Sequence, residues 1–285
     1  MSILRIAIQK SGRLSEKSLG LISEAGISFN NSDRKLITQA TNFPIELLFL
    51  RDDDIPQYVA DGVADIGIVG ENVIFEKKSP IRVVEKLGWA KCRLSIAIPK
   101  SENYTGPSYL NGKKIATSYP NILQKFLDEN KINCEIHEIS GSVEIAPGIG
   151  LADGIFDIVS SGSTLISNGL REVEVVVKSE AVIIGDPNLS AEKQEILDKL
   201  LFRTRSVQQG KRHKYVVLNA PKENVDKIVN VIPGMKSPTV VTLAQEGWVS
   251  VHSVLEESRF WDIIDQLKEC GAEGILVMPI EKMIE

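Results

Sequence analysis

The run GSVEIAPGIGLADGIFDIVSSGSTL, residues 141–165, decides how the rest of the chain is interpreted. Within it, residues 155–159 (IFDIV) form a short apolar run with one acid, which is typical of a buried parallel strand bounded by turns. The next five residues, SSGST, supply four hydroxyls and a glycine where the chain should leave the strand. We expect a helix to begin there, with Thr164 as its N-cap.

The loop after this strand favours a phosphate ligand. Backbone N–H groups, a helix N-terminus and short hydroxyl side chains converge there, and a glycine lets the backbone approach closely. Charge-assisted hydrogen bonds contribute roughly 1.5–3 kcal/mol each, so four or five can hold a phosphomonoester without a lysine. The alternative is an ordinary capped turn between strand and helix. The predicted phosphate contacts are Ser160, Ser161, Gly162, Ser163 and Thr164.

Two acids accompany this loop. Asp157 is on the strand just before it, about where a ribose diol would lie if its 5′-phosphate occupied the loop. Glu144 is a second candidate for the diol or for its metal ion. Together with the loop, these acids predict a phosphoribosyl site.

Composition limits the classes of protein that remain. The chain has 285 residues, 43% hydrophobic and 25% charged, so we expect a globular protein of two or three domains. Its net charge of −5, with acids and bases interleaved, argues against a nucleic-acid surface. Nowhere do 18 apolar residues follow one another, so we expect a cytosolic protein without a membrane segment. The isolated Cys92, Cys134 and Cys270 are expected to be reduced thiols.

Several motifs, in order along the chain, resemble the ATP phosphoribosyltransferase family, the first enzyme of histidine biosynthesis, in its long form. The resemblance covers the whole chain. It rests on KSGRL (10–14), RDDDIP (51–56), GENV (70–73), the run GSVE-AP-GLAD-DIVS-G-TL (141–165) and the closing PIEKMIE (279–285).

The start of the chain combines a buried strand at 4–9 with basic residues at a helix start. Lys10 and Arg13 oppose the helix dipole there, which is easier to explain if anions dock. The resemblance implies that Gly12, Arg13 and Leu14 contact ATP, with Lys10 facing the reacting groups. It also implies pyrophosphate contacts from Arg34, which could otherwise be a solvated surface charge, and from Arg51, at the end of a strand at 45–50. We interpret Asp52, Asp53 and Asp54 as helix caps in preference to a metal site.

An internal echo predicts two similar lobes. Residues 61–70 (DGVADIGIVG) align with 153–162 (DGIFDIVSSG), as 6–10 does with 114–118. This pattern predicts a two-lobed α/β core of the periplasmic-binding-protein type. Glu71 and Asn72 would be the first lobe's counterpart of the phosphate loop and would face the nucleotide. We expect lobe I to be discontinuous, formed by 1–95 and 178–208, with lobe II at 96–177.

After residue 209 the pattern becomes βαββαβ, a small ferredoxin-like domain at 212–285 without catalytic residues. The resemblance implies that this domain binds L-histidine as a feedback inhibitor and that the protein forms dimers and hexamers. The positions that match the family's effector site are Asn219, Thr239, Val254 and Gly274. Asn219 stands where an acid would better pair with the histidine amine, so inhibition is expected to be weaker or differently tuned.

The resemblance implies a reaction that transfers the phosphoribosyl group from phosphoribosyl pyrophosphate (PRPP) to N1 of ATP, with Mg²⁺ held mainly by substrate phosphates. The alternative is a non-catalytic two-lobed binding protein or sensor, because a fold does not determine a function. That alternative predicts a secretion signal or a helix-turn-helix, and the sequence offers neither.

Overall fold

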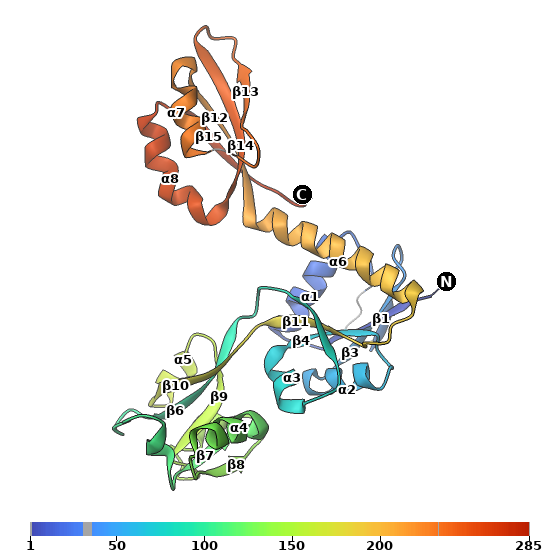
Figure 1. Cartoon of the computed structure of the whole chain (residues 1–285), viewed down its shortest axis with the longest axis vertical. Helices are drawn as coiled ribbons and strands as arrows, with labels where there is room; N and C mark the ends of the chain where they lie inside the picture. Colours follow the sequence, from blue (N-terminus) through green and yellow to red (C-terminus); the bar gives the residue numbers. More distant parts are fainter. Residues whose placement is uncertain (1, 31–35, 233, 285) are drawn as a thin grey trace. The chain divides into compact units, whose positions relative to one another are not determined.

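The computed structural model describes residues 2–30, 36–232 and 234–284 (Figure 1). These residues divide into two compact units, Met1–Leu19 with Ser28–Gln194, and Gly20–Ile27 with Glu195–Glu285. The first unit contains two sheets and the second contains one. Arg34 lies outside the described residues, and the three-part division predicted from the sequence stays a prediction.

The first sheet is mixed and mostly buried. Its strands are β1 (Leu4–Gln9), β2 (Ile37–Gln39), β3 (Ile45–Leu50), β4 (Ile66–Gly70), β5 (Arg82–Lys86) and β11 (Ala181–Gly185). They follow the order β2-β3-β1-β4-β11-β5. β1 runs parallel to β3 and β4, whereas β11 is antiparallel to β4 and β5. The carboxyl ends of β1, β3 and β4 therefore meet at one edge, where α/β sheets bind their ligands.

The second sheet repeats this topology. Its strands are β6 (Cys92–Pro99), β7 (Lys114–Thr117), β8 (Glu135–Glu138), β9 (Gly154–Val159) and β10 (Leu170–Ser179), in the order β10-β6-β9-β7-β8. β7 is parallel to β8 and β9, and β6 is antiparallel to β9 and β10. The two-lobed α/β core is thus confirmed. We call the parts built on the first and second sheets the first and second lobes.

The echo between the lobes is one of topology and not of residue register. β4 covers the second half of the segment 61–70, whereas β9 covers the first part of the segment 153–162. In the first lobe the strand passes directly into a helix at Glu71, while in the second a loop of residues 160–162 intervenes. The expected counterpart of the phosphate loop at Gly70–Asn72 is therefore not a loop.

Each lobe has its own core and short helices. The second-lobe core is centred on Leu94, Ile96 and Phe156, and the first-lobe core on Ile55 and Val69. The helices up to residue 212 are α1 (Arg13–Glu24), α2 (Ile55–Ala60), α3 (Glu71–Lys77), α4 (Pro120–Asn130), α5 (Ser163–Ser167) and α6 (Ala191–Arg212). Three short 3₁₀ turns accompany them: η1 (Asp52–Asp54), η2 (Pro107–Leu110) and η3 (Val143–Ile145). Both α1 and α6 contribute residues to the two units.

Of the predicted helix caps, Thr164 is wrong, whereas Asp54 does hold an N-cap position. The N-cap of α5 is Gly162, and Thr164 lies inside the helix, because the chain turns two residues earlier through the left-handed conformation of the glycine. The three aspartates form the turn η1, and Asp54, although it is the N-cap of α2, makes no side-chain capping hydrogen bond.

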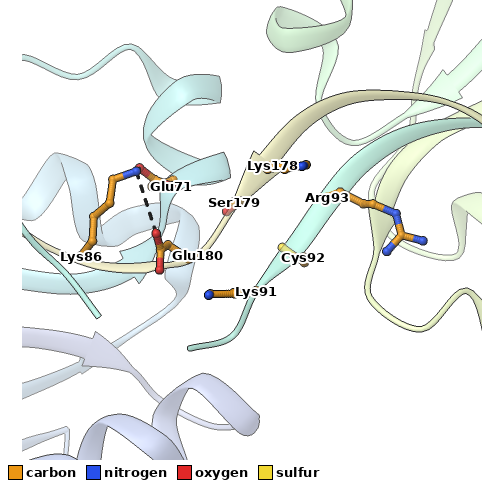
Figure 2. A pocket seen from close by; sticks show the side chains of 8 residues that line it. All are labelled: Glu71, Lys86, Lys91, Cys92, Arg93, Lys178, Ser179 and Glu180. Atoms are coloured by element: carbon orange, nitrogen blue, oxygen red, sulfur yellow. Dashed lines mark ion pairs between the residues drawn. The ribbon is translucent and has the colours of Figure 1, made fainter. Parts of the chain in front are cut away.

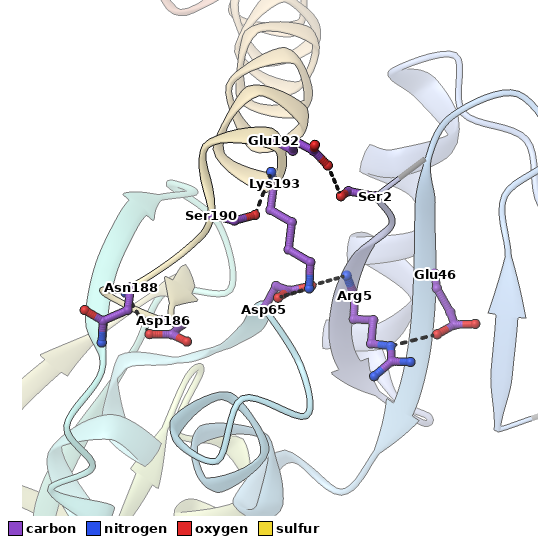
Figure 3. Close-up of polar contacts among 9 residues, drawn as sticks. All are labelled: Ser2, Arg5, Glu46, Asp65, Asp186, Asn188, Ser190, Glu192 and Lys193. Carbon is purple, nitrogen blue, oxygen red and sulfur yellow. Dashed lines mark hydrogen bonds and ion pairs between the residues drawn. The ribbon is translucent and has the colours of Figure 1, made fainter.

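A buried carboxylate ties the first lobe together. Asp65, which is 7% exposed, accepts hydrogen bonds from the backbone N–H of Arg5 at 2.8 Å and from Nζ of Lys193 at 2.8 Å. Figure 3 shows that this one side chain connects β1, the residue before β4 and the start of α6. The aspartate of the "DI" repeat is therefore structural in this lobe, because both of its oxygens are satisfied.

The lobes contact each other through α3 and α4. The carboxylate of Glu76, only 8% exposed, accepts hydrogen bonds from the backbone N–H groups of Asn121 and Ile122, both at 3.0 Å. The Asn121 amide donates to the backbone oxygen of Glu76 at 3.2 Å. A first-lobe acid thereby caps the N-terminus of a second-lobe helix, where negative charge is favourable.

The second unit contains the predicted ferredoxin-like domain. Its strands β12 (His213–Pro221), β13 (Thr239–Thr242), β14 (Trp248–Glu256) and β15 (Glu273–Pro279) are antiparallel in the order β13-β14-β12-β15. Between them lie η4 (Lys222–Asn224), α7 (Val225–Val231) and α8 (Glu257–Glu269). Leu218 and Val251 pack with Ile228 and Leu267 in its core. The βαββαβ pattern is thus confirmed.

The helix α6 is longer than the sequence predicts. The sequence predicts an amphipathic helix at 190–205, and the predicted end is wrong, because α6 continues to Arg212. Gly210 lies inside the helix where the chain end crosses it: a Cβ there would lie 2.7 Å from the backbone oxygen of Ile280. Close backbone approach, and not helix termination, explains this glycine.

Candidate functional site

The predicted phosphate loop lines a small polar cavity. The cavity, of about 180 Å³, is lined by Arg13, Glu144, Asp157 and residues 158–165. All seven residues predicted to bind the phosphoribosyl group therefore lie around one cavity, together with an arginine predicted to contact ATP. Arg13 comes from the start of α1, whereas the other residues belong to the second lobe. A basic side chain from outside the second lobe therefore lines the cavity of the second-lobe loop.

The loop itself is open and lightly braced. Ser160, Ser161, Ser163 and Thr164 are exposed. The hydroxyls of Ser161 and Ser163 are 3.0 Å apart, and the N–H of Ser163 donates to the Ser161 hydroxyl at 3.4 Å. Gly162 has φ +80°, and a Cβ there would meet only Val159, at 3.8 Å. Glycine is therefore favoured by backbone conformation and not by lack of space.

Asp157 has an unusual proton affinity. Burial, followed by the nearby carboxylate of Glu144, raises its pKa from 3.8 to about 6, while a hydrogen bond from the backbone N–H of Ile158 at 2.7 Å opposes the shift. Hydroxyl donors from a ligand would favour the ionised form. A carboxylic acid whose pKa is raised towards neutral pH, in a polar cavity, is typical of a binding site.

Opposite the second lobe lies a group of acids and bases at the strand ends of the first. Lys10 and Arg51 follow the adjacent strands β1 and β3, and the N–H of Lys10 donates to the backbone oxygen of Leu50 at 2.7 Å. Both side chains are exposed. Burial and the neighbouring Asp53 raise the pKa of Asp52. Gly12, with φ +93°, and Leu14 lie at the start of α1.

Tyr119 lies close to acids of both lobes, and the sequence analysis did not identify it. Its pKa is raised by burial and by the charges of Asp157, from its own lobe, and Asp52, from the first lobe. Its hydroxyl accepts a hydrogen bond from the amide of Asn72 at 3.4 Å. The available signal was its place just after the strand 114–117, the counterpart of β1 in the internal echo.

Glu71 and Asn72 do not line the cavity of the phosphate loop. Both are buried, at 7% and 6% exposure. The Glu71 carboxylate pairs with Lys86 at 2.8 Å, and Asn72 exchanges hydrogen bonds with the Ser179 hydroxyl. Glu71 instead lines a second cavity, of about 400 Å³, shown in Figure 2. Its other lining residues are Lys86, Lys91, Cys92, Arg93, Lys178, Ser179 and Glu180.

The four predicted effector positions fall into two pairs in the C-terminal domain. Thr239 and Val254 line a cavity of about 730 Å³ that also includes Tyr215 and His252. Asn219 lies beside Gly274, where an added Cβ would be 3.5 Å from the Asn219 amide nitrogen. Asn219 pairs with Ser250 across the sheet, four residues along β14 from Val254. Asn219 and Gly274 do not line that cavity.

Metal-binding clusters and membrane-spanning helices are both absent from the described part of the chain. Across 2–30, 36–232 and 234–284, no group of three or more His, Cys, Asp or Glu side chains could hold a metal ion. No helix in those same ranges is long and apolar enough to cross a membrane. The three cysteines are free thiols, as predicted.

Comparison with known proteins is consistent across sequence and structure. A family model described as ATP phosphoribosyltransferase matches residues 51–206, and one described as HisG, C-terminal domain, matches residues 210–282. Proteins named ATP phosphoribosyltransferase from Bacteroides thetaiotaomicron and Phocaeicola vulgatus are 61% and 62% identical over 282 residues, covering 99% of this chain and 100% of each relative. The counterpart from Cytophaga hutchinsonii is 61% identical over 284 residues, covering 100% of this chain and 99% of the relative.

Among solved structures, the ATP phosphoribosyl transferase (HisG:HisZ) complex from Thermotoga maritima aligns with a TM-score of 0.63 at 29% identity, covering 71% of this chain and 96% of that chain. The structure of Tv2483 bound to L-arginine aligns with a TM-score of 0.51 at 12% identity, covering 73% and 86% of the two chains. At that identity the second likeness concerns the fold alone.

Proposed function

This chain belongs to the long form of the ATP phosphoribosyltransferase family and catalyses the first step of histidine biosynthesis, and from this premise we propose how its residues divide the work. The 5-phosphate of PRPP lies in the loop 160–164, with its ribose diol against Asp157 and Glu144. The observation that carries this proposal is the single cavity shared by the loop and both acids.

Departure of pyrophosphate is the step that the basic residues assist. N1 of the purine is a neutral nucleophile whose lone pair forms a bond to C1′ of the ribose. The bond between C1′ and the pyrophosphate oxygen breaks, and its electron pair leaves with the pyrophosphate. No general base is needed, so positioning and electrostatic stabilisation carry the catalysis. We assign the stabilisation of the leaving group to Arg51 and Lys10, supported by their place at adjacent strand ends, and to Arg34.

We assign the nucleotide to the start of α1, against Gly12, Arg13 and Leu14. Arg13 lines the phosphoribosyl cavity, which supports a place for ATP next to the donor. Glu71 and Asn72 complete the proposed nucleotide site. Since both are buried and already bonded, they would reach the nucleotide by exchanging Lys86 and Ser179 for it.

The family needs a metal ion for catalysis, and we propose Mg²⁺. Mg²⁺ usually keeps several waters and binds through one or two carboxylates and substrate phosphates. Asp157 and Glu144, which line the same cavity, fit that requirement, and the substrate phosphates would hold most of the ion. When bound, Mg²⁺ supplies charge neutralisation for the pyrophosphate.

We further propose that L-histidine inhibits the enzyme by binding the C-terminal domain at Asn219, Thr239, Val254 and Gly274. The two pairs of residues would act together only if another copy or a rearranged sheet edge joined them. This agrees with a dimeric or hexameric cytosolic enzyme, and the Thermotoga maritima relative is itself described as a complex. The alternative of a non-catalytic binding protein is not favoured, given the family.

The test is pyrophosphate release from ATP and PRPP with Mg²⁺, repeated with added L-histidine. We expect Ser163→Ala, which removes a hydroxyl from the cavity, to raise the KM for PRPP. Ser167→Ala is the matched control, because Ser167 lies one turn later on α5 and outside the cavity. Equal KM values for the two variants would contradict the assignment of the loop, and activity indifferent to histidine would contradict the regulatory assignment.

A further inference from the structure

We propose that Arg93 is a positioning residue that aims the phosphate loop, and that Glu172 and Ser95 hold it in place. The proposal rests on the proposed function of the loop 160–164. Arg93 lies near the start of β6, paired in register with Val159, the last residue of β9 before the loop. Its Nη1 donates a hydrogen bond to the backbone oxygen of Ser160 at 3.1 Å.

The guanidinium is fixed by a bidentate partner on the next strand. Nε and Nη2 of Arg93 donate to the two carboxylate oxygens of Glu172, each at 2.5 Å. The hydroxyl of Ser95, which is fully buried, donates to the same carboxylate at 2.6 Å. These hydrogen bonds, those of Arg93 first, hold the pKa of Glu172 below its ordinary value. The planar fork therefore has one preferred orientation.

That orientation matters because a peptide unit is planar. In a trans peptide the C=O of one residue and the N–H of the next point in opposite directions. When Arg93 holds the Ser160 carbonyl, it also sets the direction of the Ser161 N–H, which points away from Arg93. Ser161 lines the phosphoribosyl cavity. Arg93 thus determines where one donor of the loop is aimed, without touching the ligand itself.

The loop has little else to hold this peptide unit. Its residues 160, 161, 163 and 164 are exposed, and Gly162 allows more backbone conformations than other residues. The pair also brings no net charge, because the carboxylate of Glu172 offsets the guanidinium. A positioning role explains a bidentate pair beside an anion site better than direct binding does, since Glu172 would repel the phosphate if Arg93 left it.

The guanidinium of Arg93 does not point into the second cavity, as Figure 2 shows. Arg93 is counted among the residues that line that cavity, yet its guanidinium points away from Glu71, Lys86 and Lys91. The guanidinium donates instead to the backbone oxygen of Ser160 in the loop.

The experiment measures kcat and the KM for each substrate in Arg93→Gln, Arg93→Lys, Glu172→Gln and the double variant Arg93→Gln/Glu172→Gln. We expect Arg93→Gln to raise the KM for PRPP about 10- to 100-fold, the effect of one charge-assisted hydrogen bond, with the KM for ATP within about twofold. Arg93→Lys should recover part of the loss, because a lysine supplies a donor but no fork. The double variant should be no worse than Arg93→Gln, because the two residues act as one unit.

Arg171→Gln is the control: its guanidinium is exposed and donates to the backbone oxygen of Glu102 at 2.8 Å, away from the loop. Thermal unfolding establishes that each variant is folded, and Glu172→Gln serves if Arg93→Gln does not fold. An unchanged KM for PRPP in a folded variant, or equal losses for both substrates, would overturn the proposal. Calorimetric binding of PRPP tests it without turnover, so wild-type protein that binds PRPP but releases no pyrophosphate would refute the proposed function and leave the positioning role to be decided by the binding constants.

Discussion

Replacement of Asp157 by asparagine isolates the energetic effect of one buried acid. In the native protein its pKa is raised from 3.8 to about 6, chiefly by burial and then by Glu144. Between pH 4 and 6 the native state therefore keeps a proton that the unfolded chain has lost, so stability falls as pH rises through this window and the full cost is present above about pH 6. The difference between these two pKa values corresponds to a loss of about 3 kcal/mol of folding free energy.

Asp157→Asn removes this titration while keeping the shape of the side chain and an acceptor for the Ile158 N–H. We expect the variant to melt at the same temperature as wild type near pH 4 and about 6–12 °C higher near pH 7, because one kcal/mol shifts the melting temperature of a domain of this size by about 2–4 °C. The assay is thermal unfolding of both proteins without ligand at several pH values. A difference in melting temperature that does not change with pH would refute the reasoning.

The same substitution should weaken the binding of PRPP about 10- to 100-fold at pH 8, since an amide accepts hydrogen bonds from a diol less strongly than a carboxylate. Calorimetric titration measures this, with the pH dependence of Asp157→Asn as the control for ionisation of the ligand's own phosphates. Above pH 6 the wild-type protein is thus expected to be less stable than Asp157→Asn and to bind PRPP more tightly. Tighter binding by the variant would contradict the assignment of the diol.

Three further predictions concern the loop, the leaving group and the lobe contact. Gly162→Ala should raise the KM for PRPP and lower stability by about 1–2 kcal/mol, whereas Gly150→Ala, at φ +75° outside the cavity, should lower stability alone; equal KM values would argue against the loop. Arg51→Ala should reduce kcat by about 10²–10³ in folded protein, and Arg82→Ala, on the edge strand β5, should leave it unchanged; unchanged turnover in Arg51→Ala rejects its role. Glu76→Gln should lower the free energy of unfolding by about 1 kcal/mol, through the α4 N-terminus, and the exposed Glu129→Gln should not, as measured by thermal melts.

The fold was predictable where each element carries its own local pattern. The apolar runs of β1, β3 and β9 and the βαββαβ order after residue 212 indicate their structures without tertiary information. The length of α6 was not predictable, because Gly210 is tolerated only through contact with residues 280–282, which no local pattern reveals. The repeat correctly predicted two lobes, but aligning its residues one to one does not superpose β4 on β9.

The site divides along the same line. Residues of the loop 160–164 and Asp157 were found because they are neighbours in sequence. Tyr119 and the pair of Arg93 and Glu172 were missed, since their partners are 47 to 79 residues away in the sequence. Glu71 and Asn72 were singled out by motif, but burial and existing partners are properties of the folded chain alone.

The order of strands in the first sheet has a consequence for the order of synthesis. β11 lies between β4 and β5 in that sheet, yet it follows every strand of the second lobe in the chain. When a growing chain has reached Ser179, all five strands of the second sheet have been made, whereas the first sheet still lacks the strand that joins β5 to the rest. The lobe that the ribosome begins first is therefore the one that it completes last.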